Sequence, residues 1–266
     1  MTPRDAARLA ERTAALPAGP GDWFSGYALL GVTFASGHVL AFRRVAASSI
    51  GPGYLSVWHR VPDGGWTFYA TVPPELACAR YFGASVDCNV LVGIEVEWPE
   101  PDELRVSVGN TLDWRVRLSS PLMARVYNSI AHFVSDQAHP SPTLLRGMGW
   151  FVDAALGTGR VTFLGRTPNR HRFRIIPRRL WLVASSAATW LGQDLGPIAP
   201  LPVHASLADL RVPQRGLFVV GREWFDQPAR RERKVAALGR PCGPEVTAGC
   251  GEQHQADGWP RGGAST

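Results

Sequence analysis

The chain has 266 residues, of which 45% are hydrophobic, and a formal net charge of +6. This length supports one large β domain or two small ones with a substantial core. Lys234 is the single lysine and lies in a charged run, which argues against Schiff-base aldolases, decarboxylases and pyridoxal-phosphate enzymes, because these need a lysine amine in a desolvated pocket.

The N-terminal segment predicts a helix followed by a linker. Thr2 suits an N-cap and Pro3 the first helical position, so we expect a helix over 2–16, which Pro17–Gly21 then ends. The N-terminal segment has no apolar h-region, and the sequence shows no stretch apolar and long enough to span a membrane. We therefore expect a soluble, cytoplasmic protein. We divide the chain into a helix and linker (1–21), a single β-rich domain (22–228) and a basic segment with a disordered tail (229–266).

The stretch Tyr54–Val72 predicts a β-hairpin around the turn VPDGG. Its register places Trp58 opposite Phe68, so one face carries Trp58, Trp66 and Phe68, and the other carries His59, Thr67 and Tyr69. Aromatic cross-strand pairs stabilise such hairpins.

Further strands are expected on both sides of this hairpin. Tyr27–Phe34 and Val39–Val45 flank a turn at Ser36-Gly37-His38, and alternation over 90–98 continues into strands at 104–108 and 112–118. Short strands at this spacing, with one apolar face, favour an antiparallel barrel or a strongly bent sheet.

The period then changes to that of helices. Ser120-Pro121 and Ser141-Pro142 each begin a helix, and Gly157 ends the second, so 120–157 is expected to be a helical hairpin inserted in the β domain. Strands resume at 161–164, 173–176, 180–184 and 217–225. The fold class is therefore mainly β (α+β).

Motifs for the common cofactors do not occur in the sequence. It has no GxxxxGK[ST], no HExxH and no glycine-rich dinucleotide fingerprint, and its four cysteines have no CxxC spacing. We predict neither a metal nor an organic cofactor. Reduced thiols are the favoured state of the cysteines, with a Cys78–Cys88 bridge as the alternative.

Several polar residues are candidates for chemistry. His59 and Tyr69 share a hairpin face and are the best candidates for catalytic acid and base, against the alternative of a polar outer face. Glu95 and Glu97 fit a solvated strand face better than a catalytic pair. His132 and Asp136 have the spacing of a helical metal chelate, but a surface role is favoured.

The segment 160–179 holds seven arginines and no acid. Such a segment suits phosphates or an anionic surface. A nucleic-acid groove is disfavoured, because Arg172 and Arg174 alternate with Phe173 and would face the opposite side of the strand. A charged outer face is the plainer interpretation, and it places His171 in an exposed turn.

The aromatic residues Trp58, Trp66, Phe68, Trp98 and Trp114 are candidates for a ligand-binding face. They form a plain core if the sheet is filled, and they line a pocket if it closes into a barrel with a cavity. Both interpretations stay open at this point.

The order of the hairpins GYALLGVTFASGHVLAFRRV, SVWHRVPDGGWTFY, EVEWPEPDELRVSV and TLDWRVRLSS resembles that of lipocalin-like barrels of the hydroxyneurosporene-synthase type. The resemblance covers 23–118 and implies a cavity for an isoprenoid, polyketide or acyl compound. We expect binding of such a hydrophobic small molecule. The alternatives are a cofactor-independent cyclase, hydratase or isomerase in the same cavity, and an anionic-surface or nucleic-acid binder acting through Arg160–Arg179.

Overall fold

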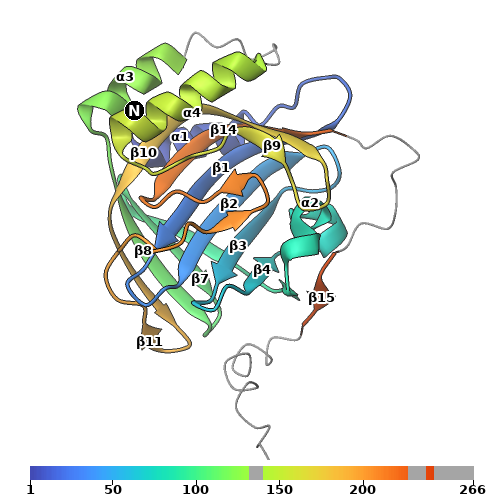
Figure 1. Cartoon of the computed structure of the whole chain (residues 1–266), viewed down its shortest axis with the longest axis vertical. Coiled ribbons are helices and arrows are strands. Elements are labelled where there is room, and N and C mark those ends of the chain that lie inside the picture. The colour runs from blue at the N-terminus through green and yellow to red at the C-terminus, as the bar shows by residue number, and fades with distance from the viewer. Residues whose placement is uncertain (132–139, 227–237, 243–266) are drawn as a thin grey trace, which may run out of the picture.

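The computed structural model of the chain describes residues 1–131, 140–226 and 238–242. Its main feature is one mostly antiparallel sheet of 13 strands, accompanied by a separate two-stranded sheet and by helices (Figure 1). The order along the large sheet is β15-β5-β4-β3-β2-β1-β14-β10-β8-β7-β6, with β9 and β11 paired to β10. The strands are β1 (Asp22–Thr33), β2 (Val39–Ser48), β3 (Tyr54–Arg60), β4 (Trp66–Ala70), β5 (Cys88–Leu91), β6 (Glu95–Glu100), β7 (Glu103–Val108), β8 (Leu112–Ser119), β9 (Leu164–Arg166), β10 (Arg172–Trp190), β11 (Gln193–Asp194), β12 (Ser206–Leu207), β13 (Leu210–Arg211), β14 (Leu217–Phe225) and β15 (Arg240–Pro241).

The sheet is strongly bent, and one short connection requires this bend. β5 and β6 lie at opposite ends of the strand order, if the two-residue β15 is set aside, yet only Val92–Ile94 join them. Four Cα steps reach at most about 14 Å, so the two ends of the sheet must approach each other. The short connection thus confirms the prediction of a strongly bent sheet. A closed barrel is not observed, because no hydrogen-bonded ladder joins those ends within the described residues.

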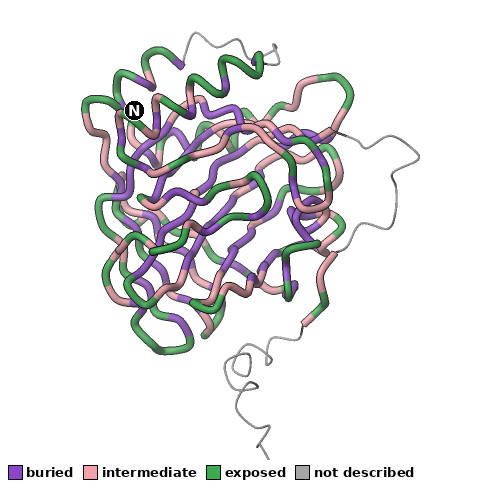
Figure 2. The backbone as a smooth tube through the Cα atoms, viewed as in Figure 1, coloured by how far each residue is buried: buried purple, intermediate pink, exposed green. Residues whose placement is uncertain are grey.

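The bend separates two hydrophobic cores. Figure 2 shows the buried segments along the strands of the sheet. The inner core joins residues of β1–β4 and β14 to residues of β7 and β8, among them Leu29, Phe42, Trp114 and Phe218. Because strands far apart in the order contribute to one cluster, this core must lie inside the bend. The outer core covers the opposite face of β1–β4, β10 and β14.

The outer core is covered by helices, loops and the small β12–β13 sheet. Four α-helices and two 3₁₀ turns occur in the described residues: α1 (Pro3–Arg12), α2 (Ala79–Phe82), α3 (Leu122–Ala131), α4 (Pro142–Leu156), η1 (Pro74–Leu76) and η2 (Gly83–Ser85). Residues of α2, α3 and α4 pack into the outer core, whereas Ala6 and Ala7 of α1 belong to the inner core. No helix of the described residues is long and apolar enough to cross a membrane.

Local signals in the sequence place several elements closely. The β3–β4 register pairs Trp58 with Phe68 as predicted, and the two rings stack with centroids 4.3 Å apart. α4 begins after the N-cap Ser141 and ends at Gly157, whose φ of 60° suits glycine. Glu97 lies opposite Arg105 in the β6–β7 ladder, and their side chains form an exposed ion pair at 3.3 Å, as expected of a solvated face.

Three strand predictions are wrong. The strand expected at 161–164 is displaced toward the C-terminus, since β9 comprises Leu164–Arg166. The alternation over 90–98 is not one strand, because the chain leaves β5 and crosses to β6 on the other end of the sheet. The segments 173–176 and 180–184 are not two strands but parts of β10, which continues through a bulge between Pro177 and Arg179. A bulge inserts an extra residue without ending the ladder, so a proline there does not break the strand.

A disulfide joins Cys88 on β5 to Cys242, beside β15. The preference for reduced thiols is therefore wrong for Cys88, and the alternative Cys78–Cys88 bridge is not formed, since Cys78 is a free, buried thiol. β15 runs parallel to β5, and Asn89 donates to the carbonyl of Leu238. Residues 238–242 thus protect an edge of the sheet, within a segment where the sequence indicated no strand.

We expect the substitution Cys242→Ser to lower the free energy of unfolding by about 2–5 kcal/mol, because the crosslink closes a loop of 154 residues in the unfolded chain. Urea unfolding with and without a thiol reductant measures this. The reductant should destabilise the original protein and leave Cys242→Ser unchanged. Equal stability of both proteins under oxidising conditions would contradict the structural role of the crosslink.

Candidate functional site

The predicted catalytic pair lies in the inner core. His59 and Tyr69 are both buried, and both rings contact Trp190, with centroids 3.7 and 5.6 Å from it. His59 Nε2 lies 2.7 Å from His38 Nδ1. The hairpin face that carries them is therefore turned inward, and neither residue lines the pockets described below.

The surroundings of His59 keep it uncharged. Burial is the main cause that lowers its pKa, and the nearby His38 lowers it further, to about 3. The pKa of His38 is also lowered by burial. A histidine of this kind is neutral throughout the physiological range and is a poor proton donor there.

The predicted aromatic face is divided between the two cores. Trp58, Trp66 and Phe68 belong to the outer core, whereas Trp98 and Trp114 pack in the inner core. The alternation within the β3–β4 hairpin places Trp58, Trp66 and Phe68 on one face, as predicted. Which sheet faces pack against each other depends on the bend, which this alternation does not predict. These five side chains therefore do not line one common cavity.

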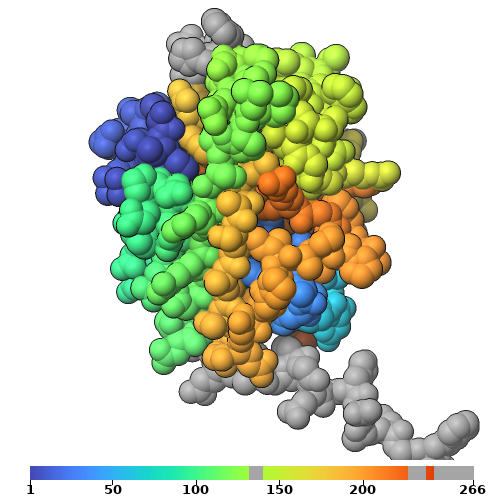
Figure 3. Space-filling model, turned by 90° about the vertical axis from the view of Figure 1, so that its left-hand side faces the viewer, coloured from blue at the N-terminus to red at the C-terminus, as the bar shows by residue number. Residues whose placement is uncertain are grey.

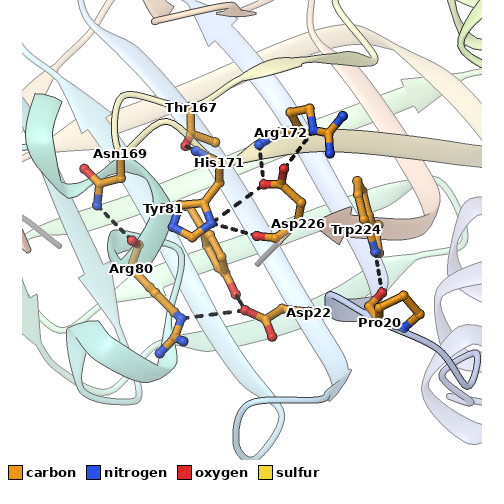
Figure 4. A network of polar contacts seen from close by, with 10 residues as sticks. All are labelled: Pro20, Asp22, Arg80, Tyr81, Thr167, Asn169, His171, Arg172, Trp224 and Asp226. Atoms are coloured by element: carbon orange, nitrogen blue, oxygen red, sulfur yellow. Dashed lines mark hydrogen bonds and ion pairs between the residues drawn. The ribbon is translucent and has the colours of Figure 1, made fainter. Parts of the chain in front are cut away.

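Acids from elsewhere in the chain contact the arginine-rich segment, and one of them pairs with Arg172 (Figure 4). Arg172 forms an ion pair with Asp226 at 2.8 Å, and Asp209 accepts the backbone N–H of Arg166. His171, expected in an exposed turn, is buried, and its Nδ1 lies 2.8 Å from the carbonyl of Asp226. The expectation that His171 lies in an exposed turn is wrong, because Tyr81 of α2 packs against its ring.

The same region holds a second, connected group of polar contacts. Tyr81 on α2 donates to the buried Asp22 at 2.8 Å (Figure 4). Its ring stacks on Phe225 with centroids 4.0 Å apart. Burial and the Asp22 carboxylate raise the pKa of Tyr81. Asn169 donates to the carbonyl of Arg80 at 2.8 Å. These contacts join α2 to the start of β1 and to the β9–β10 turn, which is a structural role.

Sequence reasoning missed a buried ionic group on the outer-core face. Arg43 on β2 pairs with Glu223 on β14 and donates to the thiol of Cys78 at 2.9 Å. The hydroxyl of Tyr54 lies 3.0 Å from the same sulfur, and burial raises its pKa. Beside Arg43 is a hollow of about 30 Å³, enough for about one water molecule. No sequence signal marks this group, because its members lie on three separate strands and at the N-cap of α2.

A far larger pocket, of about 550 Å³, lies between α3 and α4. α3 contributes Tyr127, Ile130 and Ala131 to its lining, and α4 contributes Leu144, Gly147, Met148 and Phe151. Ligand pockets have volumes of this order. In the described residues, no group of three or more His, Cys, Asp or Glu side chains could hold a metal ion.

The helix α3 is held firmly against β10 beside this pocket. Asn128 on α3 makes two hydrogen bonds with the backbone of Leu180, one donated at 3.0 Å and one accepted at 2.8 Å. Tyr127 donates to the carbonyl of Pro177 at 3.1 Å. Pro177 and Leu180 lie between the parts of β10 that pair with β9 and with β8, so α3 binds a stretch of β10 that has a strand partner only in β14.

The polar groups around the pocket are few and mostly engaged. The Ser141 hydroxyl caps α4 by accepting the N–H of Leu144 at 3.2 Å, and the Tyr127 hydroxyl is used at Pro177. Thr143 is the remaining hydroxyl of the lining. Gly147 leaves the pocket open, since a Cβ atom there would meet no atom within 4 Å. The arrangement suits an apolar molecule with few hydrogen-bonding groups.

His132 and Asp136, considered above as a metal chelate, lie outside the described residues. No protein-family model matches the chain, and no curated protein sequence matches it. Among solved structures, acetoacetate decarboxylase from Legionella pneumophila aligns with a TM-score of 0.35 and 11% identity, over 79% of this chain and 85% of that chain. A likeness this distant carries no argument about activity, and the resemblance to lipocalin-like barrels stays a prediction.

The burial of His59 predicts a pH-dependent stability. In the unfolded chain its imidazole takes up a proton near pH 6.5, whereas the folded protein binds that proton only near pH 3. The unfolded state therefore binds more protons between these values, and stability falls as the pH drops from about 7 toward 4, by up to about 1.4 kcal/mol per pH unit.

Replacing His59 by Gln should flatten this dependence between about pH 7 and 5, where most carboxylates stay ionised. Urea unfolding at several pH values measures it. The same slope in the original protein and in His59→Gln would show that the imidazole is not buried in its neutral form.

Proposed function

We propose that this protein binds a hydrophobic small molecule of the isoprenoid, polyketide or acyl type in the pocket between α3 and α4. The observation that carries the proposal is the volume of about 550 Å³ with an almost wholly apolar lining. The hydrophobic effect drives apolar ligands into such a site, and the scarcity of unengaged hydroxyls disfavours polar ones.

The location differs from the barrel cavity expected from the sequence. The inside of the bend is occupied by large side chains, including the fully buried Trp114, Phe42 and Phe218. Close packing of this kind leaves little room for a ligand. The helical hairpin that departs from a simple barrel therefore supplies the proposed site.

The alternative function, a cofactor-independent enzyme that uses His59 and Tyr69, stays a prediction. Both residues lie in the inner core and do not line the helical pocket, so this pocket gives the enzyme function no specific support. A His59→Ala variant separates the two functions, because binding in the helical pocket should persist while any turnover that needs His59 would be lost.

The proposal is tested by filling the pocket. In Gly147→Leu the new side chain would enter the open space beside α4 without meeting backbone, and leucine also favours helix by about 1 kcal/mol. We expect the affinity for an uncharged apolar dye, N-phenyl-1-naphthylamine, to fall about tenfold or more, while the melting temperature stays equal or rises. Fluorescence titration and thermal unfolding measure the two quantities.

The matched control is Ala154→Leu, an exposed position on α4 that does not line the pocket. It adds a similar apolar volume to the same helix and should leave dye affinity unchanged. Equal dye binding by Gly147→Leu and the original protein, with both folded, would refute the proposed site.

A further inference from the structure

Exposed apolar side chains gather on α3 and α4. Of the eleven large hydrophobic residues that are exposed in the described residues, six lie on these two helices: Leu122, Met123, Val126, Ile130, Leu144 and Trp150. Trp150 is 71% exposed and Leu122 65%. Contiguous apolar surface of this kind marks an interaction site, whereas isolated exposed residues do not. We call these six residues the helical apolar patch.

The helices that carry the patch also form one end of the molecule. Figures 1 and 3 both show α3 and α4 side by side there, next to the strand β10. A patch at the end of a molecule can contact a broad, flat partner without hindrance from the rest of the fold. The partner need not insert into a cleft.

The charges around the patch are mostly positive. Arg125 and Arg146 are exposed on the two helices, and Arg174, Arg178 and Arg179 follow on the part of β10 against which α3 packs. The single acid on the two helices is Asp153, whose carboxylate accepts the backbone N–H of Arg160. Arginine and an exposed tryptophan beside aliphatic residues are the combination that anchors helices at the surface of anionic membranes.

We infer that the helical apolar patch docks this protein onto anionic phospholipid bilayers. The apolar side chains enter the interfacial region, and the arginines contact the phosphate and other anionic groups of the lipid heads. A second copy of the chain is a poorer occupant, because a two-fold contact through the patch would bring arginines together without an equal number of acids.

The patch is continuous with the pocket, since Ile130 and Leu144 belong to both. An apolar ligand partitions into membranes, so docking would place the mouth of the pocket where that ligand is concentrated. This last step rests on the proposed function, whereas docking itself does not. The membrane surface is therefore the inferred source of the ligand.

The test is sedimentation of the full chain with vesicles, in about 0.15 M salt. One set is phosphatidylcholine alone, and the other contains about a third phosphatidylglycerol. We expect at least about tenfold stronger partitioning to the anionic vesicles. The double substitution Leu122→Ser and Trp150→Ser should lower partitioning about tenfold, as should Arg125→Glu with Arg146→Glu.

The control is Val203→Ser, which removes an equally exposed apolar residue outside the patch, at 76% exposure. It should sediment like the original protein. Equal partitioning of the patch variant and the original, or no preference for anionic vesicles, overturns the inference. Concentration-dependent dimers in size-exclusion chromatography that vanish in the patch variant also overturn it, in favour of self-association.

The Gly147→Leu variant distinguishes failure of this inference from failure of the proposed function. It should bind vesicles like the original protein, because its substitution fills the pocket and leaves the patch exposed. In the original protein, vesicle binding without dye binding would retain the docking surface and refute the pocket. Dye binding without vesicle binding would do the reverse.

Discussion

The three-residue connection Val92–Ile94 is the constraint on which the rest of the structure depends. It joins β5 to β6, which lie near opposite ends of a 13-stranded sheet, and it is too short to let those ends separate. The sheet must bend back on itself, and its inner face is then filled by its own side chains. The opposite face of the same strands is left needing a separate cover.

That cover explains where a binding site can arise. The inside of the bend is packed with Trp114, Phe42 and Phe218. The outer face is closed by short helices and turns, held by specific polar contacts such as Asn128 to Leu180 and Tyr81 to Asp22. With α3 fixed on β10 and Gly147 on α4 leaving open space, the two helices form the apolar pocket and the exposed patch at one end of the molecule.

The sequence predicted local features well and spatial relations poorly. The β3–β4 register and both ends of α4 follow from alternation, turn residues and caps, which act within a few residues. The separation of Trp58 from Trp98 does not, because it depends on which sheet faces the bend brings together. Nor could the Cys88–Cys242 pairing or the Arg43–Glu223 pair be read from spacing, since their partners are far apart in the chain.

The most direct test of the account is to find where an apolar ligand contacts the chain. A long-chain alcohol that carries a photoreactive diazirine can be crosslinked to the full-length protein, and the labelled peptides identified by mass spectrometry. If the ligand binds in the helical pocket, the alcohol labels α3 and α4, at Met148, Phe151 and their neighbours, and unlabelled alcohol competes with this labelling. Competed labelling of Trp114 or other inner-core residues, with α3 and α4 unlabelled, would contradict it.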